Sequence, residues 1–386
     1  MIFTFGRLDT EESGVLERIE KIRDKTKFVL QTPARWFGTL RRATFARAIR
    51  GSNSIEGYNV SVEDAIAAAD GDQPLNAEGE TWEAIVGYRN AMTYVLRLSK
   101  DPHFSHSEAL IKSLHFMMVQ YDLTKFPGSW RPGAIYVRDE KTKETVYEGP
   151  PVEAVPDLMQ ELVASLDANV SAPAMIRAAM AHLNLTMIHP FKDGNGRMAR
   201  CLQTLMMGRE GVLEPEFCSI EEYLGRNTQP YYDVLTLVGQ GQWNPGHDVR
   251  PWIRFCLKAH YQQARTIAKR VQDIQKMWDE LETELKKRGL PYRYIFALAD
   301  AATGWKVRNS TYRRIAEVSE NLASRDLKTL VDAGLLMSDG EKRGRVYVAP
   351  PILQEIRTRT RSPSRIEDPF EIKSEPEPST MLPGFG

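Results

Sequence analysis

The run HPFKDGNGRMAR, residues 189–200, gathers side chains that could act on a phosphate ester. DGNG does not continue a helix comfortably, whereas RMARCLQTLMM can begin one, so the pattern predicts a tight turn directly before a helix. Such a junction is an anion site, because unpaired N–H groups and the positive end of the helix dipole meet there. Glycine at this place lets a phosphate approach without a Cβ in the way.

Three kinds of charged side chain accompany this turn. Arg197 and Arg200 lie three residues apart on the first helical turn, and their forked donors suit a polyphosphate. Asp193 offers one hard oxygen ligand for Mg²⁺ beside phosphate oxygens. His189, with an ordinary pKa of about 6.5, suits a general base that takes a proton from an attacking hydroxyl. Taken singly, a histidine or a glycine turn is more often structural, whereas the combined pattern is specific.

Every defined position of the run matches His-Pro-Phe-x-Asp-Gly-Asn-Gly-Arg-x-x-Arg, so the chain resembles the Fic family. Fic proteins typically transfer AMP from ATP to a hydroxyl side chain of a target protein. By this resemblance His189 would deprotonate the target hydroxyl of a Ser, Thr or Tyr, Asp193 would hold Mg²⁺, and Arg200 would reach the γ-phosphate. The residues implied for the α- and β-phosphates are Gly194, Asn195 and Gly196, assisted by Arg197.

Two further segments fit the same resemblance. AIYVRDE and ETVYEGPP are typical of two short strands joined by a charged turn, and they resemble a hairpin flap that pairs with the target peptide. The flap residues implied are Thr145, Val146 and Tyr147.

The segment RNTQPYYDVL contains a tyrosine pair that the resemblance places at the nucleotide site. Tyr231 and Tyr232 resemble a pair that borders the nucleotide, although aromatic residues in a helix are as often ordinary core. Gly239 stands where some members have a polar residue on the adenine side, so base contacts are less well defined than phosphate contacts.

The segment SNSIEG, residues 52–57, matches a Ser/Thr-x-x-x-Glu-Gly/Asn pattern that marks an inhibitory helix in this family. Ser52, Glu56 and Gly57 fill its defined positions, and Glu56 would take the Arg200 guanidinium that the γ-phosphate needs. The motif alone is common in helices, but its place about 130 residues before the phosphate motif strengthens it. The chain is therefore expected to be autoinhibited.

Composition limits the classes of function. The 51 Lys and Arg balance 51 Asp and Glu, so no overall field draws the chain to nucleic acid or a membrane. Apolar runs are too short to span a bilayer, and MIFTFGRLDTEESG lacks the form of a signal peptide, which predicts a cytoplasmic protein. Cys201, Cys218 and Cys256 show no metal or disulfide spacing and are expected to be buried thiols.

Helical periodicity interrupted by Gly, Pro and Asn predicts a mainly α protein. The resemblance implies a Fic-type helical bundle with a β-hairpin flap over residues 34–256, with the inhibitory helix at about 40–57. An N-terminal segment, 1–33, precedes it. Residues 257–290 are typical of a long charged helix, either a spacer or a helix that forms a homodimer.

The C-terminal part, residues 291–350, resembles a winged helix-turn-helix. Its recognition-type helix is expected at 322–333, with Lys342, Arg343 and Arg345 on the wing. Residues 303–350 hold nine Lys and Arg against six Asp and Glu, a small excess that favours a packing or protein-interaction role over DNA binding. Residues 351–386 are rich in Pro, Ser, Thr and charge, which predicts a disordered tail.

The main hypothesis from the sequence is an autoinhibited AMP transferase that uses ATP and Mg²⁺ and acts on a hydroxyl side chain of a protein target, with the chain itself as one candidate target. Removal of AMP from a modified target by water that Glu56 activates, or transfer of another phosphate-containing group, remains open. A third hypothesis is a DNA-binding regulator in which the helical domain senses nucleotide. The absence of GxxxxGK[ST] argues against a Walker-type kinase or ATPase.

Overall fold

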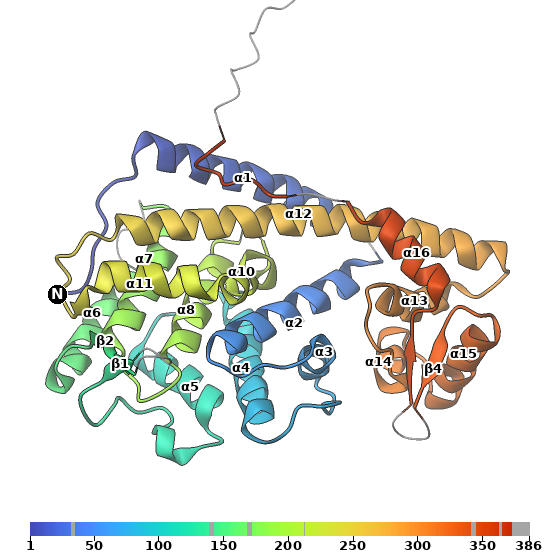
Figure 1. The fold of residues 1–386 in the computed structure, drawn as a ribbon, viewed down its shortest axis with the longest axis horizontal. Helices are drawn as coiled ribbons and strands as arrows, with labels where there is room; N and C mark the ends of the chain where they lie inside the picture. The colour runs from blue at the N-terminus through green and yellow to red at the C-terminus, as the bar shows by residue number, and fades with distance from the viewer. Residues whose placement is uncertain are drawn as a thin grey trace, which may run out of the picture.

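The computed structural model describes residues 1–31, 35–138, 143–167, 172–211, 213–340, 345–362 and 365–372, and it confirms a mainly α protein (Figure 1). Helices carry nearly all of the buried core, and the strands are short. No helix in the described part of the chain is long and apolar enough to cross a membrane.

Two long helices, α1 (Thr10–Gln31) and α12 (Arg250–Lys287), run side by side along one edge of the molecule (Figure 1). Arg250 joins them by donating to Asp9 at 3.0 Å and to Glu12 at 2.7 Å. The long helix was expected at 257–290, and α12 begins seven residues earlier, at Arg250. Its first turns are buried in the helical bundle at Trp252. It is not a free spacer, because one face is apolar along its whole length.

The bundle is built around α7 (Ala174–Ile188) and α8 (Asn195–Arg209), which pack against each other on either side of the phosphate motif. Both are buried nearly all round, as expected for central helices. The surrounding helices are α2 (Phe37–Ile55), α3 (Val62–Asp70), α4 (Gly79–Leu98), α5 (Glu108–Val119), α6 (Val155–Asp167), α9 (Pro215–Cys218), α10 (Glu221–Arg226) and α11 (Thr228–Gly239).

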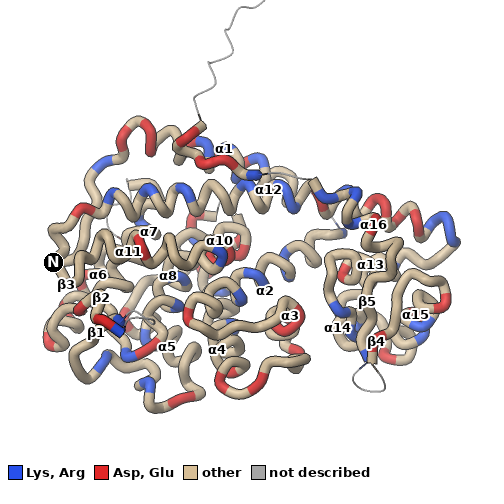
Figure 2. The backbone as a smooth tube through the Cα atoms, viewed as in Figure 1, with Lys and Arg blue, Asp and Glu red and all other residues tan. Residues whose placement is uncertain are grey.

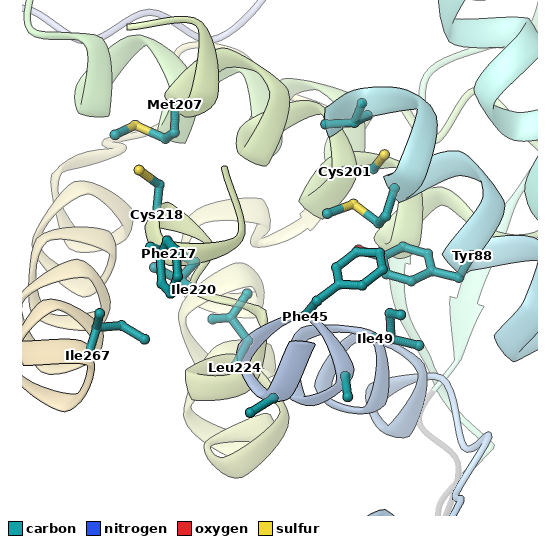
Figure 3. Packing of buried hydrophobic residues seen from close by; sticks show 14 of the residues in the cluster. Phe45, Ile49, Tyr88, Cys201, Met207, Phe217, Cys218, Ile220, Leu224 and Ile267 are labelled. Atoms are coloured by element: carbon teal, nitrogen blue, oxygen red, sulfur yellow. The ribbon is translucent and has the colours of Figure 1, made fainter. Parts of the chain in front are cut away.

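Apolar side chains from α2, α4, α8 and the α9–α10 region meet in the core shown in Figure 3. Phe45 and Ile49 of α2 lie there beside Tyr88 and Cys201, and all four are buried. The prediction of buried thiols is confirmed for the three cysteines, which are free and buried.

Helix α2 crosses α10 at very short range because glycines face each other at the crossing. A Cβ on Gly51 would lie 2.9 Å from the Cα of Glu222, and a Cβ on Gly225 would lie 2.6 Å from the Cα of Gly51. Backbones can approach this closely only where no side chain intervenes. The crossing therefore sets the depth at which α2 lies on the bundle.

The predicted hairpin is present. β1 (Tyr136–Arg138) pairs antiparallel with β2 (Thr145–Glu148), and β3 (Gly241–Gln242) pairs parallel with β2 at Tyr147 and Glu148. The predicted charged turn falls on 139–142, outside the described residues. Two single-turn 3₁₀ helices, η1 (Leu123–Lys125) and η2 (Val152–Ala154), lie before and after the hairpin in the chain.

After η3 (Tyr292–Tyr294), a C-terminal module follows α12. Its helices are α13 (Ile295–Ala302), α14 (Asn309–Ile315) and α15 (Glu320–Asp332), and β4 (Met337–Asp339) pairs antiparallel with β5 (Val346–Val348). This order agrees with the expected helix-turn-helix and hairpin, and its assignment as a winged helix stays a prediction. Figure 2 shows both signs of charge around α14 and α15. Lys342 and Arg343 lie outside the described residues.

The expectation of a disordered tail from residue 351 is wrong at its start. Pro351–Thr360 forms helix α16, which packs on α12 and α13 through the buried Leu353 and Ile356. These two apolar residues, spaced three apart, are enough to seat one helical face, although the flanking composition is polar. Residues 373–386 lie outside the described part.

Candidate active site

The predicted turn and helix start are where the sequence placed them. Gly194 caps α8 with a left-handed backbone (φ 81°), a conformation that favours glycine. The Asn195 side chain closes the turn by accepting from Phe191 N–H at 2.9 Å and donating to Phe191 O at 2.8 Å. The Asn195 side chain thus shapes the turn that presents the helix N-terminus, and the place of Asn195 in the phosphate nest stays a prediction.

Arg197 is buried completely, yet its Nε, Nη1 and Nη2 atoms have no hydrogen-bond partner among the described residues. The nearest anionic group is the Oδ2 atom of Asp193, 3.5 Å from Nη2, and the ring of Tyr58 lies 5.2 Å from the guanidinium carbon. A buried cation without hydrogen-bond acceptors costs free energy. The arrangement fits a ligand that supplies anionic oxygens.

Arg200 is bound by the predicted inhibitory segment. Its Nε donates to Ser52 Oγ at 2.7 Å, and its Nη2 donates to Ser52 O at 3.0 Å and to Glu56 Oε1 at 2.6 Å. Burial alone would lower the pKa of Arg200, but the Glu56 carboxylate raises it above its ordinary value. The Nη1 atom has no partner among the described residues, so one of the three guanidinium nitrogens stays available to a ligand.

The two glycines next to this pair have separate roles. A Cβ on Gly196 would collide with Glu56 Oε1, so only glycine lets that carboxylate lie over the first turn of α8. Gly57 adopts φ 83° where the chain leaves α2. The structure thus brings the whole predicted inhibitory motif onto the phosphate motif.

His189 ends α7 with a left-handed backbone (φ 51°). Its Nδ1 lies 3.2 Å from Thr186 O, and a carbonyl can only accept, so Nδ1 carries the proton and Nε2 keeps a free lone pair. Burial lowers the pKa of His189 to about 4, although the bond to Thr186 opposes this shift. The ring is therefore neutral at neutral pH, as a base requires.

Asp193 lies between the turn and a lysine. Its Oδ1 accepts from Gly194 N–H at 2.6 Å, and its Oδ2 lies 3.1 Å from Lys125 Nζ. Burial alone would raise the pKa of Asp193, but Arg197 and Lys125 outweigh it and lower the pKa below the ordinary value. The described residues contain no cluster of three His, Cys, Asp or Glu that could hold a metal ion. Among the described residues, no further side chain of these types joins Asp193 in such a cluster.

Sequence analysis missed His115. The Nε2 of this buried α5 residue donates to Asp193 O at 3.0 Å, its Nδ1 accepts from Gly128 N–H at 2.9 Å, and its ring stacks on Phe191 with centroids 3.7 Å apart. In ALIKSLHFMMV it appears as one polar residue on an apolar helix face, so only the tertiary contacts reveal that it positions the motif.

Arg131 was missed as well. It lies in SWRPG, and its buried guanidinium donates to His189 O at 3.0 Å and to Pro150 O at 2.5 Å. Its own N–H donates to Pro190 O at 2.8 Å. Arg131 thus ties the motif backbone to the end of the hairpin. No spacing in the sequence relates these positions.

The two tyrosines differ. Tyr231 is buried and shares a hydrogen bond of 2.9 Å with His182 Nε2, and burial raises its pKa to about 12. Tyr232 is 43% exposed and donates to Ile55 O at 3.0 Å, directly before Glu56. Tyr231 has the packing of ordinary core, Tyr232 contacts the inhibitory segment, and a nucleotide role for either stays a prediction.

The three flap residues also divide. Thr145 is exposed, Val146 is half-buried, and Tyr147 is buried with its hydroxyl donating to Met187 O at 2.8 Å. Because β3 occupies the second edge of β2 at Tyr147 and Glu148, Thr145 and Val146 form the part of that edge left for another strand.

The chain matches known proteins through this region. A family model described as the Fic/DOC family matches residues 105–207. Protein adenylyltransferase fic-1 of Caenorhabditis briggsae is 32% identical over 119 residues, which cover 29% of this chain and 21% of that protein. Protein adenylyltransferase Fic of Nematostella vectensis is 27% identical over 245 residues, 62% of this chain and 53% of that protein. The chain thus spans about half or less of these relatives.

Solved structures share the fold. A Fic family protein from Desulfovibrio desulfuricans G20 superposes with a TM-score of 0.58 at 20% identity, over 90% of this chain and 98% of that chain. Fic-1 from C. elegans gives a TM-score of 0.53 at 22% identity, over 66% of this chain and 71% of that chain.

Proposed function

This chain is a Fic family protein, and we propose that it transfers AMP from ATP to a hydroxyl group of a protein. The observation that carries the proposal is a neutral histidine beside buried guanidinium nitrogens that have no hydrogen-bond acceptor among the described residues. His189 presents Nε2 with its lone pair, while the guanidinium nitrogens of Arg197 and the Nη1 of Arg200 have no hydrogen-bond acceptor in the described part of the chain. An alcohol and a polyphosphate are the two reactants that such groups accommodate.

His189 acts on the acceptor hydroxyl. It takes the hydroxyl proton on Nε2 as the oxygen forms a bond to the α-phosphorus, and the bond from that phosphorus to the bridging oxygen of pyrophosphate breaks. The Thr186 carbonyl keeps the ring in the required tautomer, and Arg131 holds the His189 backbone. Both contacts reduce the motion of the base.

The start of α8 binds the phosphates. Gly194 and Gly196 leave room for the oxygens, Arg197 neutralises them, and Arg200 meets the γ-phosphate. Asp193 is ionised and would hold Mg²⁺, which supplies further charge neutralisation when bound together with ATP. The residues fit this ligand because the buried, unpaired guanidinium atoms call for anionic oxygens.

Glu56 holds the enzyme in an inhibited state. Its carboxylate takes one arm of Arg200 and lies where the first turn of α8 is open, so it competes with the γ-phosphate for charge and space. Ser52 and Tyr232 keep the segment in place through Arg200 and the Ile55 carbonyl. Activity then requires that this segment withdraw.

The target protein binds along the hairpin. The exposed Thr145 and half-buried Val146 offer strand-edge groups to an extended target segment, whereas Tyr147 is fixed by Met187 and β3. Main-chain pairing there would hold a hydroxyl side chain of the target at the mouth of the site.

The deciding experiment uses ATP labelled on either the α- or the γ-phosphate, with Mg²⁺ and a mixture of proteins. We expect the label on protein from the α-position alone, faint with the wild type and strong with Glu56→Gly. His189→Ala should abolish it, and His103→Ala, an exposed histidine elsewhere, should not. Label from the γ-position would indicate kinase chemistry, and equal labelling by Glu56→Gly and wild type would remove the inhibitory role.

Removal of AMP is the alternative reaction for the same site. A protein modified beforehand with labelled AMP distinguishes it, because the wild type would release the label and Glu56→Gly would not. Glu56 is essential for AMP removal and dispensable for AMP transfer. The Glu56→Gly substitution therefore abolishes the first reaction and increases the second.

A further inference from the structure

We propose that Lys125 is a resident counter-cation of Asp193, which a divalent cation arriving with the nucleotide must displace. The inference rests on the proposed function, because it concerns the carboxylate expected to hold Mg²⁺. It assigns a role to a residue outside the phosphate motif.

Lys125 is held in a built site. Its Nζ lies 2.7 Å from Glu80 Oε1, 2.9 Å from the Tyr121 hydroxyl, 3.1 Å from the Tyr58 hydroxyl and 3.1 Å from Asp193 Oδ2. Its side chain is 13% exposed. Three partners besides Asp193 thus hold the ammonium, so Asp193 is only one of the groups that keep it in this place.

The Lys125 ammonium lies next to the carboxylate oxygen of Asp193 that would bind the metal ion. Oδ1 is engaged with Gly194 N–H at 2.6 Å, and Arg197 Nη2 is 3.5 Å from Oδ2. Oδ2 takes no part in the turn and is therefore the oxygen that would bind a hard cation, and Lys125 Nζ lies 3.1 Å from it. A divalent ion at this oxygen meets the positive charges of Lys125 and Arg197 at short range, and like-charge repulsion weakens its binding.

Lys125 also contacts the residue that directly follows the inhibitory segment. Its partner Tyr58 follows Glu56 and Gly57 directly, and Glu80 accepts from the same Tyr58 hydroxyl at 2.9 Å. When a divalent cation takes the place of Lys125 at Asp193, the ammonium keeps Glu80 and Tyr121 as hydrogen-bond partners. The residue can therefore move away from the carboxylate without losing all of its hydrogen bonds.

Lys192 offers a matched control. It precedes Asp193 in the chain, but its Nζ donates to Thr124 O at 2.9 Å and lies 5.2 Å from the Phe126 ring centroid. It carries the same charge in the same region and makes different contacts. A nonspecific electrostatic effect would act through both lysines, whereas competition at Oδ2 acts through Lys125 alone.

The test measures binding, not turnover. In the Glu56→Gly protein, Mg²⁺ is titrated against a fixed concentration of a fluorescent ATP analogue, and anisotropy gives the Mg²⁺ concentration for half-maximal binding. We expect Lys125→Met to lower that concentration by about tenfold, as removal of one close, partly screened like charge allows, and Lys192→Met to leave it unchanged. Glu80→Gln, at a carboxylate 58% exposed, should raise it, because Lys125 then relies more on Asp193.

Lys125→Met and Glu80→Gln are expected to change the required Mg²⁺ concentration in opposite directions. Glu80→Gln therefore still tests the proposal if Lys125→Met folds poorly. An unchanged Mg²⁺ requirement in Lys125→Met together with Glu80→Gln overturns it. Weaker nucleotide binding by Lys125→Met at an unchanged Mg²⁺ requirement also overturns it, since Lys125 would then be a direct phosphate ligand. No analogue bound by any variant would instead refute the proposed function.

Discussion

Two arginines in this site have buried guanidinium nitrogens without hydrogen-bond acceptors among the described residues, and a bound anion would supply those acceptors. Arg197 has no exposed surface and three nitrogen atoms without acceptors among the described residues, whereas Arg200 is satisfied in part by Glu56. We expect bound phosphate oxygens to supply Arg197 with the acceptors that the described residues do not provide.

Arg197→Met tests this balance. Methionine keeps an unbranched apolar stem and brings no charge or unsatisfied donor into the buried site, so we expect the ligand-free protein to be more stable by about 1–2 kcal/mol. Stabilisation by ATP with Mg²⁺ should disappear. Thermal unfolding with and without nucleotide measures both, and Arg209→Met at the far end of α8 serves as the control. Full stabilisation of Arg197→Met by nucleotide would contradict the assignment.

The pH profile tests His189. The neutral imidazole is the active form, and burial lowers its pKa to about 4, below the ordinary value of 6.5. Transfer by Glu56→Gly should therefore persist on lowering the pH from neutral to about 5.5, where an unshifted histidine would be about 90% protonated. Single-turnover rates across this range give the profile. A fall centred near the ordinary histidine pKa would show that the ring is not shielded as described.

At the level of elements, helix α2 links the bundle to the inhibitory motif. Ser52 and Glu56 lie at its C-terminal end, one residue and five residues after the close glycine crossing with α10. Any displacement of α2 at Gly51 is passed along a rigid helix to Glu56.

Gly51→Ala should loosen inhibition. The added Cβ meets Glu221 and Glu222 backbone atoms, so α2 must shift, at a cost of about 1–3 kcal/mol. We expect greater AMP transfer as Glu56 moves from Arg200. Gly38→Ala, on the same helix with nothing within 4 Å, is the matched control for helix propensity. Destabilisation of Gly51→Ala without any gain in transfer would show that α2 and Glu56 are uncoupled.

At the scale of the whole molecule, the C-terminal module docks against the helices that carry the inhibitory motif. Arg42 of α2 pairs with Asp300 of α13 and lies 3.7 Å from Asp70 of α3, and Arg314 of α14 reaches the same Asp70 at 3.0 Å. Thr311 donates to Asp72 at 2.8 Å. This module is therefore packed against the bundle, in keeping with the packing role that its small charge excess favoured.

Arg42→Met should weaken this interface in a pH-dependent way. It leaves the buried Asp70 and Asp300 short of a counter-charge, which costs about 3–5 kcal/mol when both are ionised. Burial already raises the pKa of Asp70 to about 6 and raises that of Asp300. A raised carboxyl pKa means that the folded state binds the proton more tightly. The Arg42 charge holds the pKa of Asp70 down, so its removal raises that pKa further, and the variant regains stability as the pH falls from neutral toward 6 and below.

Urea unfolding of Arg42→Met at pH 7.5 and pH 5 measures the effect, with Arg50→Met, an exposed residue of the same helix, as the control. Equal destabilisation at both pH values would indicate that lost packing, not the unpaired carboxylates, accounts for the change.

Sequence patterns predicted the local features well. The helix start at Asn195, the α2 segment and the hairpin follow from glycine placement and helical or strand periodicity, which act over a few residues. The tail was misjudged because polar composition outweighed Leu353 and Ile356, whose helix forms only against α12 and α13. Burial by a distant partner cannot be read from a short window.

By itself the sequence determined the phosphate motif and the chemistry of its side chains, because these depend on residue types at short, fixed spacings. The candidate partner of Arg200 came from the resemblance of residues 52–57 to an inhibitory motif. The tertiary structure alone decided that Glu56 reaches Arg200, that Lys125 lies against Asp193 and that His115 and Arg131 support the motif. These contacts join residues from separate helices and loops. Their distances are set by how the helices pack, and that packing is the collective result of the whole core.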